Sequence, residues 1–261
     1  MPIQNTKEIH KFAEPYPEID QRLAEAARYA LMRRIAPVIR HNLAGSIQPV
    51  AMTAALLKRR LQKPDIDRAV LEKTAGDMAV LARESATAVV ESMTWFTPVA
   101  QTTVALAQGI GECVHLLSTP LSFQGFEIDR KALNETTEAS GALVLRDSLR
   151  SVFGCTLLAM TDSATLAGVT GTFVIELLPS DDCVSVQISL KNTQANPTLE
   201  TSQIFRHLRC EDAVALAAVE NVQLQWLPLP VQDNPSLPMP SPSLIPQGAL
   251  LKFVRMLPDT E

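Results

Sequence analysis

The chain contains 261 residues, with many apolar and few aromatic side chains, and carries a formal net charge of −5. This length allows one large domain or two of modest size. The negative charge and the lack of a strongly basic run argue against a nucleic-acid-binding face. No apolar run approaches the roughly 20 residues of a membrane-spanning helix, and the polar start lacks the apolar core of a secretory signal. We therefore expect a cytoplasmic protein without nucleic-acid or membrane partners.

The cysteines are widely spaced and form no Cys-x-x-Cys pair, which disfavours a zinc site. The histidines His10, His115 and His207 show no metal-ligand spacing either. We expect no metal, and we expect the cysteines to be buried, reduced thiols in a reducing cytoplasm. These cysteines are Cys113, Cys155, Cys183 and Cys210.

A polar tail, residues 1–16, precedes a long apolar-periodic segment that runs from residue 17 to Gln62 and contains Pro37 and Pro49. Its apolar residues alternate at spacings of three and four, the period at which one side of a helix packs on its neighbours. This stripe consists of Ile35, Ile39, Leu43, Ile47, Val50, Ala54, Leu57 and Leu61.

A second helix follows a turn at residues 63–65, with Asp65 as its expected N-cap because a carboxylate there accepts from free amides of the next helix. The helix ends before Pro98, since the residue before a proline is biased out of helix. Its apolar stripe consists of Leu71, Ala75, Met78, Ala82, Ala86, Val89, Met93 and Phe96. Residues 17–97 are therefore expected to form an antiparallel helical hairpin.

Such a hairpin has one wide apolar face and nothing of its own to cover it. We expect a second copy of the chain to cover this face, which gives a homodimer built on a symmetric four-helix bundle. In the alternative interpretation, the C-terminal half of the same chain covers it.

Residues 98–261 alternate between helical and extended patterns. Helices are predicted for residues 103–117, 142–160 and 211–220, and strands for 122–128, 169–178, 183–190, 222–227 and 250–257. Residues 228–247, rich in proline and serine, are expected to be a connector. Helices set against a mainly antiparallel sheet predict an α/β sandwich, so the whole chain belongs to the α+β class.

His41 lies two positions from both Ile39 and Leu43, so at about 100° per residue it points away from the packed stripe of its helix. Ala44 and Gly45 leave space beside it for another molecule. This arrangement is typical of a nucleophile or a docking point. The alternative is an ordinary surface histidine, with Gly45 and Pro49 marking a kink or a break in the helix.

The order of these elements resembles the catalytic core of bacterial two-component sensor histidine kinases, from about residue 20 to 258. The stretch IRHNLAGSIQP is similar to the phosphoacceptor motif, which implies that His41 is the phosphorylated histidine. LRDSLRSVFGCTLLAMTDS is similar to the N-box helix of the ATP-binding domain. VSVQISLKNTQANP matches the strand and loop that carry an Asp-x-Gly-x-Gly motif in this family, and GALLKFVRMLP resembles the closing strand.

The chain departs from this family at the expected nucleotide site. Cys155 stands where the resemblance implies a magnesium-binding asparagine, and a thiol is a poor ligand for this hard cation. Lys191 replaces the adenine-binding aspartate, and Thr193 and Ala195 replace glycines. We therefore expect a degenerate ATP-binding domain and no cofactor.

The resemblance also implies roles around His41. Asn42 replaces an acidic residue and is expected to orient the ring without acting as a base. Gly45 stands where kinases with phosphatase activity hold a polar residue, so this activity is not expected. A receiver domain is expected to dock at Arg34, Arg40, Ala44, Gly45 and Gln48, with Arg34 nearest the phosphoryl charge.

Three functions follow from this interpretation. The first is a histidine phosphotransferase of a bacterial two-component phosphorelay, which passes a phosphoryl group between receiver-domain aspartates through His41 without ATP; magnesium is then expected on the partner receiver only. The second is an inactive pseudo-histidine-kinase that acts as a scaffold or sequesters a response regulator. The third is an ATP-dependent kinase with misaligned motifs.

Overall fold

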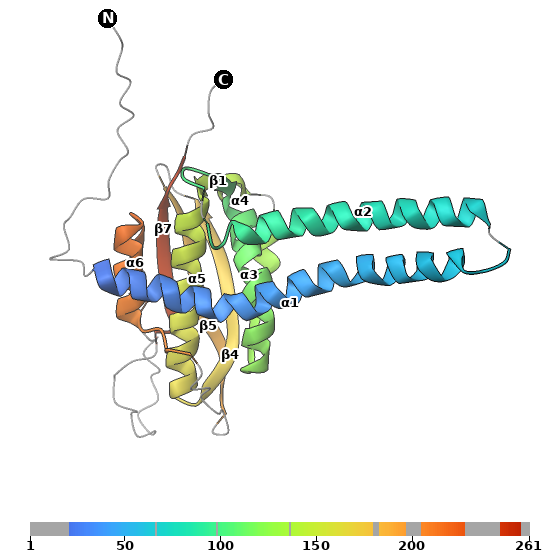
Figure 1. The fold of residues 1–261 in the computed structure, drawn as a ribbon. Coiled ribbons are helices and arrows are strands. Elements are labelled where there is room, and N and C mark those ends of the chain that lie inside the picture. Colours follow the sequence, from blue (N-terminus) through green and yellow to red (C-terminus); the bar gives the residue numbers. More distant parts are fainter. Residues whose placement is uncertain are drawn as a thin grey trace, which may run out of the picture. The chain divides into compact units, whose positions relative to one another are not determined.

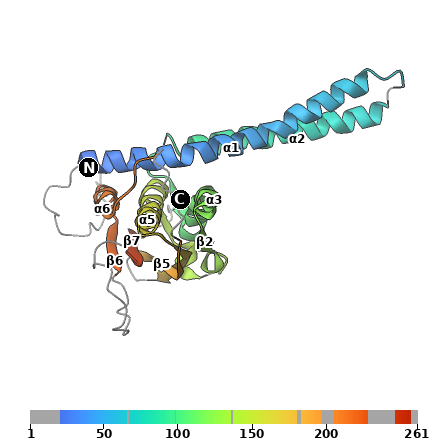
Figure 2. The same cartoon turned by 90° about the horizontal axis from the view of Figure 1, so that it is seen from below.

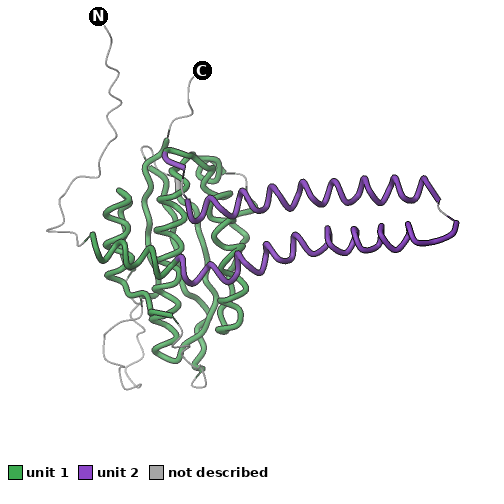
Figure 3. The backbone as a smooth tube through the Cα atoms, viewed as in Figure 1, with its two compact units in different colours: residues 1–31, 101–261 green, residues 32–100 purple. Residues whose placement is uncertain are grey.

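The computed structural model describes residues 21–65, 67–97, 99–135, 137–179, 183–196, 205–227 and 246–256. The chain divides into two compact units (Figure 3), one formed by residues 1–31 and 101–261 and the other by residues 32–100. We call them unit 1 and unit 2. The predicted polar tail and most of the predicted connector, residues 228–245, lie outside the described residues.

Unit 2 is a helical hairpin (Figure 1). Helix α1 spans Gln21–Leu61 and helix α2 spans Arg68–Met93. Pro37 and Pro49 lie inside α1 without ending it, so the helix continues through both. The predicted N-cap of α2 is wrong: Asp67, not Asp65, caps it by accepting hydrogen bonds from the amides of residues 69 and 70. Asp65 comes two residues too early for its carboxylate to take this role.

Polar contacts join the two helices of the hairpin at two levels. The Ser85 hydroxyl donates a hydrogen bond of 2.7 Å to the carbonyl oxygen of Ser46. Nearer the turn, the Arg60 guanidinium donates to the Thr74 hydroxyl. Thr74 and Ser85 are both buried although they are polar. These contacts confirm the antiparallel pairing predicted from the two apolar stripes.

Ile35 and Ile39 of the predicted stripes are buried, and Phe96, which follows α2, is exposed. The other stripe residues divide into two halves. One half is partly buried, for example Val50 on α1 and Met78 on α2. The other half is exposed in the single chain: Ile47, Ala54 and Leu61 on α1, and Ala75, Ala82, Ala86 and Met93 on α2. We call these seven residues the open apolar face.

Unit 1 contains a five-stranded mixed sheet in the order β2-β4-β5-β7-β6. Its strands are β2 Phe126–Asp129, β4 Val169–Pro179, β5 Cys183–Ala195, β6 Gln223–Leu227 and β7 Gly248–Val254. The pair β2–β4 is parallel and the other pairs are antiparallel. This arrangement confirms the predicted α/β sandwich with a mainly antiparallel sheet, and the whole chain is α+β.

Helices cover one face of this sheet (Figures 1 and 2). They are α3 Leu106–Phe123, α5 Arg146–Leu166 and α6 Cys210–Val219, with the short helices η1 Lys131–Leu133 and α4 Glu138–Gly141 between α3 and α5. The core between the layers includes Phe126 and Phe173, whose rings stack with centroids 5.5 Å apart. Residues 21–31 of α1 also belong to unit 1 and lie on the outer side of α5.

The predicted starts of two helices are wrong. Residues 103–105 and 143–145 form short strands, β1 Thr103–Ala105 and β3 Leu143–Leu145, which pair with each other. The first amides of a helix have no partner within the helix. Here the amides of Leu106 and Arg146, the first residues of α3 and α5, each donate a hydrogen bond of 2.9 Å to a main-chain carbonyl of the strand pair or its flank. Helix α3 also runs on to Phe123, where an extended segment was predicted.

Strand β5 is longer than predicted and includes residues expected in a loop. Lys191, Gln194 and Ala195 remain paired with β4, with Lys191 opposite Thr172. Two features accompany this extension. Residues 192 and 193 of β5 lie opposite the single residue Gly171 of β4, which makes a bulge in β5, and Asn192 has a positive φ of 52°. A Cβ atom on Gly171 would lie 2.7 Å from the carbonyl oxygen of Lys191, so the strands approach this closely because residue 171 is glycine.

Candidate functional site

His41 is exposed on α1, as are its neighbours Arg40 and Asn42. Two positions before it, Ile39 is buried, and two positions after it, Leu43 is partly buried. The predicted orientation of the histidine, away from the packed side of its helix, is therefore confirmed. An imidazole presented in this way is accessible to a second macromolecule.

The space beside His41 is open. A Cβ atom on Gly45, one turn after the histidine, would meet no atom within 4 Å. Ala44 and Gln48 are exposed as well, whereas Arg34 is partly buried and has an interaction partner. Within unit 2, the exposed residues beside the imidazole therefore include two of the smallest types, at Ala44 and Gly45.

Side-chain hydroxyls hold the helix turn that follows His41. Pro49 has no amide hydrogen, so the carbonyl of Gly45 loses the hydrogen bond that a helix normally supplies. The Ser46 hydroxyl donates to the carbonyl of Leu43 over 2.9 Å, and Ser85 of α2 donates to the carbonyl of Ser46. The first contact lies within α1, and the second attaches α1 to α2 five residues after the histidine, so this turn is held from both helices.

The predicted nucleotide residue Cys155 lies on a polar stripe of α5. Ser148, Cys155 and Asp162 are spaced seven residues apart, which places them on one side of the helix. The Ser148 hydroxyl donates a hydrogen bond of 2.7 Å to Glu220, at the end of α6. At the other end of the stripe, the amide of Leu208 donates a hydrogen bond of 2.7 Å to Asp162. We call this contact between α5, residues 205–209 and α6 the α5–α6 seam.

Cys155 lies between Ser148 and Asp162 on the same side of α5 and is wholly buried. It presents sulfur, and the oxygen-bearing side chains one heptad away on either side already have partners within the seam. Magnesium bound with a nucleotide needs oxygen ligands that can reach it. The residues of the seam therefore do not fit a magnesium–nucleotide complex.

The other predicted nucleotide residues lie in a different environment. Lys191, Thr193 and Ala195 are exposed on the last part of β5. The Lys191 ammonium is 3.7 Å from a carboxylate oxygen of Glu176 on β4. A cation paired with a carboxylate presents no acceptor to the amino group of adenine, so this position does not fit the base either.

A second polar network joins the start of α5 to α3. The Arg150 guanidinium donates two hydrogen bonds, of 3.0 and 2.7 Å, to one carboxylate oxygen of Glu112, and Arg146 lies 3.6 Å from the other oxygen. Burial raises the pKa of Asp147 next to this network, and the nearby Arg150 charge opposes that shift. The positive charges of Arg146 and Arg150 are balanced by the carboxylates of Glu112 and Asp147, so the network is suited to holding α3 and α5 together.

Burial also raises the pKa of two cysteine thiols. It raises the pKa of the Cys113 thiol to about 12, and it raises the pKa of Cys210 in the same direction. None of the four cysteines, all of which lie in the described part of the chain, forms a disulfide. Cys113 and Cys155 are buried, as predicted, whereas Cys183 and Cys210 are only partly buried.

Sequence reasoning missed Glu220, Ser148 and Asp162. The positions of Ser148 and Asp162, one heptad to either side of Cys155, were a usable signal for both residues. Glu220 gave no comparable signal, because its cationic partner Arg28 is 192 residues away in the sequence. Contacts of this kind depend on the fold.

The described residues contain neither a metal-binding cluster nor a membrane-spanning helix. No three His, Cys, Asp or Glu side chains among them are grouped so that they could bind a metal ion. No helix in the described segments is both long and apolar enough to span a membrane.

No family model matches the sequence, and no curated protein matches it either. The chain is similar in structure to histidine kinases. Acinetobacter baumannii AdeS is 12% identical with a TM-score of 0.36, covering 79% of this chain and 97% of AdeS. A Burkholderia phymatum histidine kinase is 15% identical with a TM-score of 0.32, and the match covers 82% of this chain and 97% of that kinase. The histidine kinase ThkA, solved with the response regulator protein TrrA, is 13% identical with a TM-score of 0.33. This match covers 95% of this chain and 70% of the ThkA chain.

Proposed function

We propose that this protein is a homodimeric histidine phosphotransferase, which carries a phosphoryl group between receiver-domain aspartates through His41 and uses no ATP. The observation that carries the proposal is the exposed His41 on a continuous helix, with no atom within 4 Å of a Cβ on Gly45. A phosphorylated aspartate has to approach the imidazole in line, and this open surface permits the approach.

The transfer step needs few groups from the protein that carries the histidine. A lone pair on a neutral ring nitrogen attacks phosphorus, the bond between phosphorus and the aspartate oxygen breaks, and the carboxylate leaves with its electron pair. The receiver supplies magnesium and the acidic pocket in this proposal. Asn42 cannot take the ring proton, so its part is to orient the ring, and exposed Arg40 is available to the phosphoryl oxygens.

The absence of ATP from this proposal is supported by the residues of the seam and of β5. Cys155 is buried and offers sulfur, and Lys191 is paired with Glu176. The dimer is supported by the open apolar face of unit 2, because seven apolar side chains in two helical stripes are of the kind that a second hairpin covers.

The proposal is tested by phosphoryl transfer. Receiver domains from the source organism are phosphorylated with a labelled small-molecule phosphodonor, purified, and mixed with wild-type protein, His41→Gln or His115→Gln. His115 is a matched control, because it is also an exposed helical histidine. We expect label on the wild type and on His115→Gln, and none on His41→Gln. Label on His41→Gln at the wild-type level would contradict the proposal.

A pseudo-histidine-kinase that only binds a response regulator is the second candidate. The observation that favours it is Asn42, which is exposed beside His41 and cannot act as a base. It predicts that a receiver binds and that no variant, including the wild type, acquires label. An ATP-dependent kinase predicts heat of binding when ATP and magnesium are titrated into the protein, whereas both other candidates predict none.

A further inference from the structure

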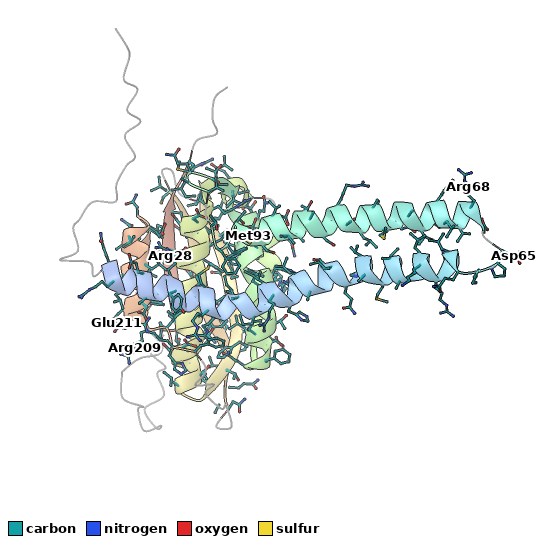
Figure 4. All side chains as sticks on the ribbon, viewed as in Figure 1. Arg28, Asp65, Arg68, Met93, Arg209 and Glu211 are labelled. Atoms are coloured by element: carbon teal, nitrogen blue, oxygen red, sulfur yellow. The ribbon has the colours of Figure 1, made fainter. Side chains whose placement is uncertain are left out.

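The carboxylate of Glu220 joins three helices of unit 1. Glu220 lies directly after α6 and is its C-cap. One of its oxygens accepts a hydrogen bond of 2.7 Å from the Ser148 hydroxyl of α5, and the other forms an ion pair with Arg28 of α1. Figure 4 labels Arg28 on the part of α1 that belongs to unit 1. We call Arg28, Ser148 and Glu220 the latch.

The charge of Glu220 makes it dependent on these partners. A carboxylate at the C-terminal end of a helix lies next to the negative end of the helix dipole, which is unfavourable. The positive charge of Arg28 offsets this unfavourable interaction, and so does the hydrogen bond from Ser148, which lies in the first turn of α5. Removing the cation therefore weakens the attachment of the end of α6 to both other helices.

The rest of the buried side of α1 in unit 1 consists of three alanines and one large apolar side chain, Leu31. Ala24, Ala27 and Ala30 are buried, and Leu31 lies 3.2 Å from the position of a Cβ on Gly154. Alanine buries little apolar area, so such a contact allows close approach but contributes little free energy by itself. Leu31 holds the last turn of this segment, and the Arg28–Glu220 ion pair is a substantial part of what holds the turns before it, where the buried apolar residues are alanines.

Cys155 follows Gly154 directly and lies one heptad after Ser148. It is wholly buried, between the latch at one end of the seam and the Asp162–Leu208 hydrogen bond at the other. We propose that the latch keeps the α5–α6 seam closed over Cys155, so that the place where the resemblance implies a nucleotide is filled by the protein's own helices. Because Arg28 and His41 belong to one helix, opening the seam at the latch also releases the first turns of the helix that carries the histidine.

The proposal is tested on the whole protein by the rate at which N-ethylmaleimide alkylates each cysteine, resolved by peptide mass spectrometry. A buried thiol reacts when its surroundings open locally, so its rate reports the opening equilibrium. Arg28→Met keeps the apolar stem and removes the charge, and Glu220→Gln keeps the shape. Losing a partly exposed charged contact is expected to raise the rate at Cys155 by about 3- to 10-fold.

Two controls make the result decisive. Cys113 on α3 is equally buried and is an internal reference whose rate should not change. Arg255→Met removes a different ion pair of unit 1, Arg255–Glu138 at 2.8 Å, and should leave Cys155 unchanged. An unchanged rate at Cys155 in both latch variants would overturn the proposal, and so would a parallel rise at Cys113. No receiver takes part, so failure here is separate from failure of transfer at His41.

Discussion

Leu149 of α5 lies where a side chain on Gly109 of α3 would have to be: its Cδ2 atom is only 2.4 Å from the position of a Cβ on residue 109. Val104 crowds the same position at 2.8 Å. The absence of a side chain at residue 109 therefore sets how closely α3 approaches α5, and the Glu112–Arg150 contact lies one turn further along α3.

Gly109→Ala is expected to lower the free energy of unfolding by about 1–3 kcal/mol, because overpacking outweighs the better helix propensity of alanine. Gly111→Ala is the matched control on the same helix, since a Cβ there meets no atom within 4 Å. It is expected to be neutral or stabilising by up to about 1 kcal/mol. Urea denaturation of both variants measures the difference, and equal effects would contradict this account of the interface.

Gly45→Trp is expected to leave the fold intact and to reduce phosphoryl transfer to His41 by about tenfold or more, because a large ring one turn from the histidine displaces the incoming receiver. Gly76→Trp on α2 is the control, since a Cβ at either glycine meets no atom within 4 Å. Transfer rates and melting temperatures are compared for the two variants. Normal transfer by Gly45→Trp would show that the receiver does not approach this side of α1.

Ile47→Glu and Ala82→Glu are expected to convert a dimer into a monomer, because each would bury an unpaired charge in the open apolar face of a four-helix bundle. Val80→Glu is the control, because Val80 is exposed on α2 but lies outside the predicted stripe. Light scattering after size-exclusion chromatography gives the mass. A monomeric wild type would rule out the dimer outright.

Cys113 is expected to make stability depend on alkaline pH. Below pH 9.0 the thiol is protonated in both states, so it causes no pH dependence. Above this value the unfolded thiol ionises, whereas burial raises the folded pKa to about 12. The free energy of unfolding therefore falls as pH rises between these values, by at most about 1.4 kcal/mol per pH unit. The difference between wild type and Cys113→Ala should shrink from pH 9 to 10.5, and a constant difference would contradict the assignment.

The sequence was most informative where structure is local and periodic. The spacing of Ile39, His41 and Leu43 was sufficient to predict which side of α1 carries the histidine, because a helix repeats every 3.6 residues. The helical hairpin and the α+β class followed from the same kind of periodicity, together with turn residues between the predicted elements. Local patterns failed at short pieces such as β1 and β3, which are strands because they pair with each other across some 40 residues.

Tertiary structure decided the features that join distant segments. Nothing near Glu220 in the sequence indicates that Arg28 and Ser148 share its carboxylate, and nothing near Lys191 indicates that Gly171 lets β5 continue as a strand. The local sequence indicates the helical or strand period on which a side chain lies, and the residue type sets its polarity. Its partners are fixed only when the chain closes on itself, because hydrogen bonds and ion pairs act over a few ångströms in space, whatever the separation along the chain.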